Sequence, residues 1–163
     1  MSRRIVCENL RSAYNVWNII RTADGLGWGV VLVWYTAPIE HKKVSKTALW
    51  AEQLIPLIHF TALEEFYVWV KKHCYCLVSL EITPDSHSLD EPWLVEYIVE
   101  ECILWKRWSW LCVVVWNEVV WVEWSTLSVS DYHISIPMFG IKESFNVWQA
   151  AAIAMWEMRR NTK

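Results

Sequence analysis

Glycine is scarce in this 163-residue chain, with four residues in all, and proline occurs five times. Glycine usually makes up about 7% of a globular protein, and this low content excludes collagen-like and Gly/Pro-rich low-complexity chains. No stretch approaches about 18 uncharged apolar residues, so the sequence predicts no transmembrane helix. The first residues, MSRRIVCE, contain no apolar h-region, which predicts that there is no signal peptide.

Cysteine does not occur in a pattern that indicates disulfides or a metal site. The five cysteines form an odd number without a framework spacing, and His73 alone does not complete a zinc site (Cys7, Cys74, Cys76, Cys102, Cys112). Buried, reduced thiols are the favoured interpretation. They predict a cytoplasmic protein that holds no metal.

What the chain has in abundance is apolar residues. Hydrophobic residues make up 55% of the sequence, which excludes a mainly disordered chain. The length predicts a single domain over residues 1–163.

The charge is unevenly distributed, although the net charge of −3 by itself argues weakly against binding nucleic acid. Residues 1–50 carry seven Lys/Arg against three acids, and the other residues carry eight against fifteen. A basic surface of this kind suits phosphate, but an ordinary solvated face explains it equally well. On charge alone, both interpretations stay open.

Uniformly apolar strands alternate with helices along the chain. Strands are expected at 3–7, 29–35, 75–80, 110–115 and 133–136, and helices at 15–26, 61–72 and 143–160; 54–60 is a short extended piece, and 91–106 is left unassigned. This pattern predicts an α/β fold with a mostly parallel sheet that is flanked by helices. In such sheets ligands bind beyond the carboxyl ends of the strands.

The segment 134–160 is the strongest candidate for a ligand site. It joins a strand end, a loop containing Gly140, the polar residues Ser144 and Asn146, and an Ala-rich helix. The amides of such a loop and of the first helical turn lack intrahelical partners, so they are available to a ligand.

Four segments of the sequence carry a recognisable pattern: NVWNIIRTAD at 15–24, HKKVSKTAL at 41–49, VVVWNE at 113–118, and the pair IPM at 136–138 with ESFNV at 143–147. Together they resemble the SpoU/TrmH-type RNA ribose 2′-O-methyltransferases of the SPOUT class. The matches span nearly the whole chain in the family's order and spacing. The resemblance implies a C-terminal trefoil knot, S-adenosylmethionine as the cofactor, a tRNA or rRNA substrate and a homodimer with its active site at the subunit interface.

The resemblance also implies roles for individual residues. The positions that match the family's catalytic residues are Asn15, Arg21, Glu118, Ser144 and Asn146. Those that match the enclosure of the cofactor are Leu80, Trp116, Ile136, Ser144 and Phe145. The basic N-terminal third is the candidate RNA surface (Arg11, Lys42, Lys43, Lys46).

Each catalytic candidate also has a structural explanation. Ser144 and Asn146 are good helix N-caps, Asn15 is a good helix start, and Glu118 fits as a loop acid. The reference pKa of arginine lies above 12, so we expect Arg21 to grip phosphate and orient the ribose rather than to act as a base. The proton acceptor stays partly unassigned.

Fourteen tryptophans are several times ordinary usage. Six occupy positions where the family usually has glycine or another small residue (Trp17, Trp34, Trp50, Trp116, Trp121, Trp148). They are engineered, natural, or misassigned in the sequence. Trp28, Trp69 and Trp93 align with no expected glycine and are predicted to fill the core.

The leading hypothesis from the sequence is therefore an RNA 2′-O-methyltransferase. The first alternative is a catalytically silent RNA-binding dimer whose cofactor pocket is obstructed by Trp116. A general α/β protein that binds a small ligand is the second.

Overall fold

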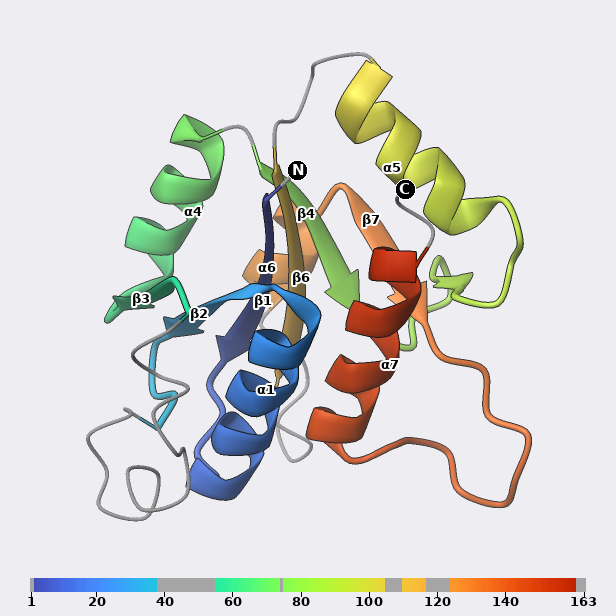
Figure 1. The fold of residues 1–163 in the computed structure, drawn as a ribbon, viewed down its shortest axis with the longest axis horizontal. Helices are drawn as coiled ribbons and strands as arrows, with labels where there is room; N and C mark the ends of the chain where they lie inside the picture. The colour runs from blue at the N-terminus through green and yellow to red at the C-terminus, as the bar shows by residue number, and fades with distance from the viewer. Residues whose placement is uncertain (1, 38–54, 74, 105–109, 117–123, 161–163) are drawn as a thin grey trace.

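Parallel strands form one sheet in the computed structural model, which describes residues 2–37, 55–73, 75–104, 110–116 and 124–160 (Figure 1). The order of the strands across the sheet is β3-β2-β1-β6-β4-β7-β5, and each pair of neighbours is parallel. The strands are β1 Ser2–Glu8, β2 Gly29–Val33, β3 Leu57–Phe60, β4 Tyr75–Leu80, β5 His87–Ser88, β6 Trp110–Trp116 and β7 Tyr132–Ser135.

The central strands consist mainly of apolar and β-branched residues because both of their faces are covered. All five residues of β2 are buried, and so are the five residues that follow Trp110 in β6. β6 lies between β1 and β4, with Ile5 opposite Val113 and Val78 opposite the same residue. β6 is the sixth of the described strands along the chain, but it lies in the middle of the sheet.

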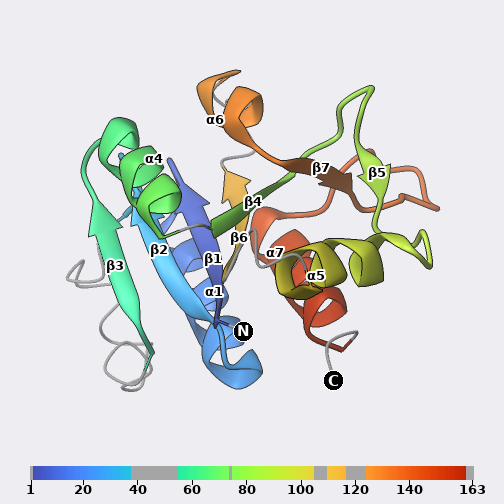
Figure 2. The same cartoon turned by 90° about the horizontal axis from the view of Figure 1, so that it is seen from above.

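Helices cover both faces of the sheet (Figure 2). α1 (Ala13–Leu26), α5 (Leu94–Leu104) and α7 (Val147–Arg160) lie on one face, where α1 and α7 pack side by side; α4 (Leu63–Lys72) and α6 (Trp124–Val129) lie on the other. Each face has its own apolar core, one around Ile19 and Met155, the other around Phe66. The predicted α/β class with a parallel sheet is confirmed. The trefoil knot stays a prediction, because residues 117–123 lie outside the described part of the chain.

The helix ends differ from the sequence expectation because of local capping. α1 begins at Ala13, since Ser12 caps it and accepts a hydrogen bond from the Asn15 amide at 3.4 Å. Asn15 therefore lies within the first turn and does not start the helix. At its other end α1 stops at Gly27, whose φ of 69° is the left-handed conformation that glycine adopts without strain.

α7 begins at Val147, four residues later than the sequence suggested. Asn146 caps it, because its Oδ1 accepts a hydrogen bond from the Trp148 amide at 3.2 Å and its carbonyl accepts one from the Gln149 amide at 2.9 Å. The stretch from Glu143 to Asn146 is consequently free to face the end of the sheet. The structural explanation as a helix cap therefore holds for Asn146, and Ser144 lies two residues before that cap.

A buried polar chain holds α6 against the carboxyl end of β1. The hydroxyl of Thr126 donates to Oε2 of Glu8 at 2.7 Å, and the Tyr67 hydroxyl lies 2.6 Å from the same Thr126 oxygen. Glu8 is 1% exposed and Thr126 is fully buried. Because a buried carboxylate is costly without a hydrogen-bonding partner, this contact fixes where α6 starts.

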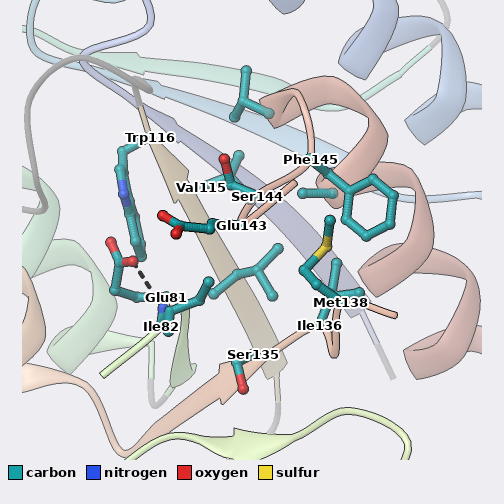
Figure 3. Close-up of a pocket in the computed structure, with 13 residues that line it drawn as sticks. Glu81, Ile82, Val115, Trp116, Ser135, Ile136, Met138, Glu143, Ser144 and Phe145 are labelled. Carbon is teal, nitrogen blue, oxygen red and sulfur yellow. Dashed lines mark hydrogen bonds between the residues drawn. The ribbon is translucent and has the colours of Figure 1, made fainter. Parts of the chain in front are cut away.

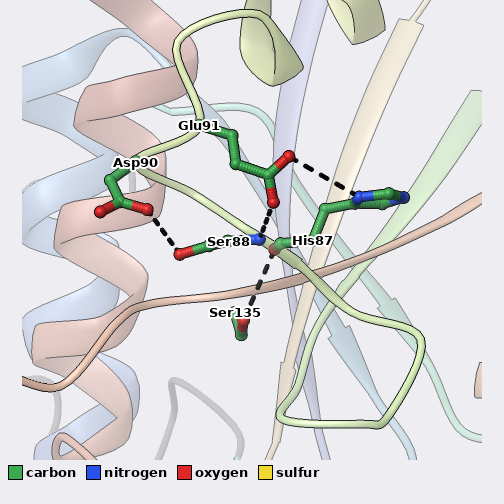
Figure 4. A network of polar contacts seen from close by, with 5 residues as sticks. All are labelled: His87, Ser88, Asp90, Glu91 and Ser135. Atoms are coloured by element: carbon green, nitrogen blue, oxygen red, sulfur yellow. Dashed lines mark hydrogen bonds and ion pairs between the residues drawn. The ribbon is translucent and has the colours of Figure 1, made fainter.

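β5 joins the sheet through a compact polar network (Figure 4). The Ser88 amide donates to Glu91 at 2.9 Å and the Ser88 hydroxyl donates to Asp90 at 2.6 Å. The His87 ring lies 3.9 Å from Glu91, and the Ser135 hydroxyl donates to the carbonyl of His87 at 3.5 Å. A strand of two residues has no sequence periodicity, which is why β5 was not predicted.

The cysteines and the tryptophans occupy varied environments. Cys7, Cys76 and Cys112 are buried, while Cys74 lies outside the described residues. Trp28 is buried and Trp69 is partly buried against the core, as predicted, but Trp93 is 50% exposed and does not fill the core. Within the described residues, no helix is long and apolar enough to cross a bilayer, and no cluster of metal-binding side chains occurs.

β2 ends at Val33, two residues earlier than predicted, because the next residue leaves the extended conformation. Trp34 has a positive φ of 59°. Among the described non-glycine residues, Asn9 is the only other one with a positive φ, at 53°. A residue with a Cβ in this left-handed region costs about 1–2 kcal/mol. The backbone at position 34 therefore suits glycine.

We expect Trp34→Gly to be more stable than Trp34→Ala by about 1 kcal/mol, because both lose the indole but only glycine accepts a positive φ without strain. Urea unfolding of the two variants measures the difference. The same pair at Trp69, inside α4, is the control and should show the opposite order, since glycine weakens a helix interior. Equal stability of the two variants at position 34 would contradict the predicted backbone strain at Trp34.

Candidate functional site

A pocket of about 590 Å³ opens at the carboxyl ends of β4, β6 and β7 (Figure 3). Its walls come from these three strand ends, from the segment before α7 and from the first turn of α7. The lining residues are Leu80, Glu81, Ile82, Val115, Trp116, Ser135, Ile136, Met138, Glu143, Ser144, Phe145, Val147 and Ala150. The volume lies within the range of about 300–1,000 Å³ that small-molecule pockets have.

The sheet register explains why these residues meet. Leu80 ends β4 and Trp116 ends β6, and these parallel strands are neighbours, so their carboxyl ends lie at the same edge. Ile136 directly follows β7, which pairs with β4 on its other side. Because α7 starts only at Val147, Ser144 and Phe145 lie in the segment before the helix. Both residues line the pocket beyond the strand ends.

The five residues predicted to enclose a cofactor all line this pocket, although they come from four separate segments (Leu80, Trp116, Ile136, Ser144, Phe145). The fold alone brings them together, since their separation along the chain reaches 65 residues. That they bind a cofactor stays a prediction.

Glu81 gives the pocket a half-buried carboxylate. Burial raises the pKa of Glu81, while hydrogen bonds from the Ile82 amide and with the Trp116 side chain oppose that rise. The Ile82 amide donates to Oε1 of Glu81 at 2.8 Å (Figure 3). The other carboxylate of the pocket, Glu143, is exposed. No lysine or arginine lines the pocket among the residues that the structure describes.

The predicted catalytic residues are only partly brought together. Ser144 is exposed and lines the pocket, whereas Asn15, Arg21 and Asn146 do not line it. Asn15, in the first turn of α1, and Asn146, the cap of α7, both belong to the ends of helices that follow strand carboxyl ends. Glu118 lies outside the described residues.

Arg21 lies on the exposed surface of α1. Its guanidinium carbon is 5.7 Å from the centroid of the Trp17 ring, one helical turn earlier, which is a cation–π distance. The indole nitrogen of Trp17 is buried and has no hydrogen-bond partner among the residues that the structure describes. In its own chain, therefore, Arg21 contacts Trp17 and stands apart from the pocket.

Of the predicted RNA-binding residues, the structure describes Arg11 alone. Arg11 is exposed in the loop that joins β1 to α1, at the same end of the sheet as the pocket. Lys42, Lys43 and Lys46 lie outside the described residues, as do Trp50 and Trp121.

Two of the tryptophans at small-residue positions adjoin the pocket region. Trp116 forms one wall and lies beside Glu81 in Figure 3, and Trp148 packs partly buried against the core from the first turn of α7. A volume of about 590 Å³ stays open beside Trp116.

Glu81, Met138 and Glu143 line the pocket, although none of them was predicted as a site residue. A usable signal existed for Glu81, because it is the first polar residue after a buried strand whose carboxyl end faces the expected ligand site. Whether Met138 and Glu143 reach the pocket depends on the path of the loop before α7. A loop has no periodic sequence pattern from which this path could be predicted.

Comparison with known proteins identifies relatives along almost the whole chain. The model of the SpoU rRNA methylase family matches residues 2–156. A protein of Staphylococcus haemolyticus assigned to the TrmH family of tRNA/rRNA methyltransferases is 24% identical over 165 residues, which cover 98% of this chain and 59% of that protein. The 23S rRNA (guanosine-2′-O-)-methyltransferase RlmB of Neisseria meningitidis is 26% identical over 161 residues, covering 96% of this chain and 57% of that enzyme.

A solved structure shares the fold. The AdoMet-bound rRNA methyltransferase of Sinorhizobium meliloti superposes with a TM-score of 0.82 at 21% identity, covering 99% of this chain and 57% of that one. The chain thus spans somewhat under three fifths of the length of these three proteins.

Proposed function

The chain belongs to the SpoU rRNA methylase family, and on this premise we propose that it transfers a methyl group from S-adenosylmethionine to a ribose 2′-hydroxyl of tRNA or ribosomal RNA. The observation that carries the proposal is the convergence of Leu80, Trp116, Ile136, Ser144 and Phe145 on one pocket. The RlmB relative is named as a 2′-O-methyltransferase, which supports the ribose oxygen as acceptor.

The pocket suits this cofactor chemically. Leu80, Val115, Ile136, Met138 and Val147 offer apolar walls for a flat base. S-adenosylmethionine supplies an electrophilic methyl group on a sulfonium, so the chain needs no metal for the transfer. Its residues must hold the reactants in line and keep water away.

We assign the acceptor side of the reaction to residues at the pocket mouth and on α1. The exposed hydroxyl of Ser144 is placed to hydrogen-bond a ribose, and Arg21 is suited to a bidentate grip on the neighbouring phosphate. Asn15, Asn146 and Glu118 complete the proposed catalytic set by orienting these groups. Arg11, with Lys42, Lys43 and Lys46, is proposed to bind the RNA backbone.

A homodimer is part of the proposal because Arg21 does not reach the pocket of its own chain. α1 and α7 lie side by side with Arg21 on the exposed surface of α1 (Figure 1). A second copy packed against this region would bring Arg21 of one subunit to the pocket of the other. A cytoplasmic location, which buried cysteine thiols favour, completes the proposal.

The alternative is a silent RNA-binding dimer of the same fold. The observation that favours it is the position of Trp116, a bulky side chain in the wall of the pocket where the family usually has a small residue. This alternative requires that the space left beside Trp116 in the pocket be too narrow for S-adenosylmethionine.

The proposal is tested by incubating the protein with methyl-tritiated S-adenosylmethionine and with RNA from cells that lack this protein. We expect tritium in tRNA or rRNA, and mass spectrometry of the digested RNA should locate the methyl group on ribose. RNA binding without methyl incorporation would instead support the silent dimer. Methylation of a base would show that the acceptor is misassigned.

A further inference from the structure

Glu81 is the charged group that the pocket holds most firmly. It directly follows β4, and its backbone amide donates to the carbonyl of Ile134 in β7 at 2.8 Å. Its carboxylate is held by the Ile82 amide at 2.8 Å and lies next to Trp116 (Figure 3). Both its main chain and its side chain are thus fixed at the junction of three strand ends.

Among the residues that the structure describes, no lysine or arginine lines the pocket beside this carboxylate. Glu81 and Glu143 are the charged residues among the described residues that line the pocket, and both are acids. Glu81 is half-buried, and its raised pKa reflects the loss of water around the charged form. A ligand that brings a positive charge would offset that loss, whereas a neutral ligand would not.

The proposed reaction offers two ligands that differ in this one respect. S-adenosylmethionine carries a sulfonium cation, and the product S-adenosylhomocysteine has a neutral thioether in its place; the adenine, the ribose and the amino-acid group are shared. The methyl group leaves the sulfur for the ribose oxygen, the bond electrons stay on the sulfur, and the hydroxyl proton passes to solvent or a base. The charge near the carboxylate disappears in this step.

We infer that Glu81 is a specificity-determining residue that makes the pocket prefer the sulfonium cofactor over its neutral product. The inference rests on the proposed function. In this view, Glu81 favours the binding of S-adenosylmethionine over that of S-adenosylhomocysteine. Inhibition by the product is therefore weaker than it would be without the Glu81 charge. Glu143, at the exposed edge of the same pocket, contributes less because solvent screens its charge.

The test is the affinity of each ligand for the wild-type protein and for Glu81→Gln, measured by isothermal titration calorimetry. The amide keeps the size of the side chain and an acceptor oxygen for the Ile82 amide, while it removes the charge and the second carboxylate oxygen, which is an acceptor for the Trp116 side chain. We expect affinity for S-adenosylmethionine to fall about fivefold, while that for S-adenosylhomocysteine changes by less than about twofold. The inhibition constant of the product, relative to the KM of the cofactor, should fall in parallel.

Two matched variants control for the charge change. Glu143→Gln removes the exposed acid of the same pocket and should alter the ratio of affinities by less than Glu81→Gln. Glu100→Gln, on the exposed side of α5 and outside the pocket, should leave the ratio unchanged. Thermal melting of each variant confirms that the fold is retained.

The possible failures are distinguishable. Binding of both ligands with an unchanged ratio in Glu81→Gln would overturn the inference and leave the proposed function standing. A lower kcat in Glu81→Gln with an unchanged ratio would also overturn it, and would point to a role in proton removal. If the wild-type protein binds neither ligand, the proposed function itself fails and the inference with it.

Discussion

Arg21→Ala is expected to lower methyl transfer by about a thousandfold or more, while the affinity for S-adenosylmethionine stays within about twofold of wild type. The two effects separate because the Arg21 side chain lies on the exposed surface of α1 over Trp17, away from the residues that line the pocket. Its guanidinium can grip and orient the RNA, but within its own chain it cannot support the cofactor.

Single-turnover methylation and calorimetric binding measure these two quantities on the same preparation. Arg21→Lys keeps the charge but loses the bidentate geometry, so it should recover only part of the rate. Arg160→Ala, at the exposed end of α7, is the matched control and should behave like wild type. A large loss of cofactor affinity in Arg21→Ala would show that Arg21 belongs to the cofactor site.

Trp116→Gly is expected to raise the affinity for S-adenosylmethionine by about tenfold or more. The indole forms a wall of the pocket at the end of β6, and its removal widens the pocket and lets a ligand approach the backbone. Calorimetric titration of the variant beside the wild-type protein measures the change. Trp93→Gly, at a half-exposed position outside the pocket, controls for the loss of an indole.

The outcome at position 116 also separates the enzyme from the silent dimer. If Trp116 merely narrows the pocket, both proteins bind and Trp116→Gly binds more tightly. Binding by Trp116→Gly alone would mean that the wild-type pocket is closed, as the alternative requires. A loss of affinity in Trp116→Gly would contradict both and would make the indole part of the binding surface.

The strands of this fold were predictable, and several helix ends were not. Apolar, β-branched runs at β1, β2, β4 and β6 are typical of strands that are covered on both faces, and the structure has them there. The start of α7 was placed at residue 143, but the cap at Asn146 moves it to Val147. α5 was left unassigned, although Leu94, Val95, Ile98 and Val99 form a buried face with helical spacing.

The composition of the pocket was predictable from the family resemblance, and its electrostatics were not. Leu80 and Phe145 match positions that the resemblance assigns to the enclosure of the cofactor, and both line the pocket at the strand ends. The half-buried state of Glu81 depends on Trp116 and on the pairing of β4 with β7, which are contacts between distant segments. The strain at Trp34 likewise appears only in the backbone geometry.

Titration of S-adenosylmethionine into the wild-type protein tests the central claim most directly, provided that the intact mass of the sample confirms its tryptophans. We expect saturable binding at one site per chain. This binding should be lost in Ala150→Trp, which places an indole in the pocket from the first turn of α7. Absence of binding to wild-type protein of the correct mass, or undiminished binding by Ala150→Trp, would contradict the assignment of this pocket to the cofactor.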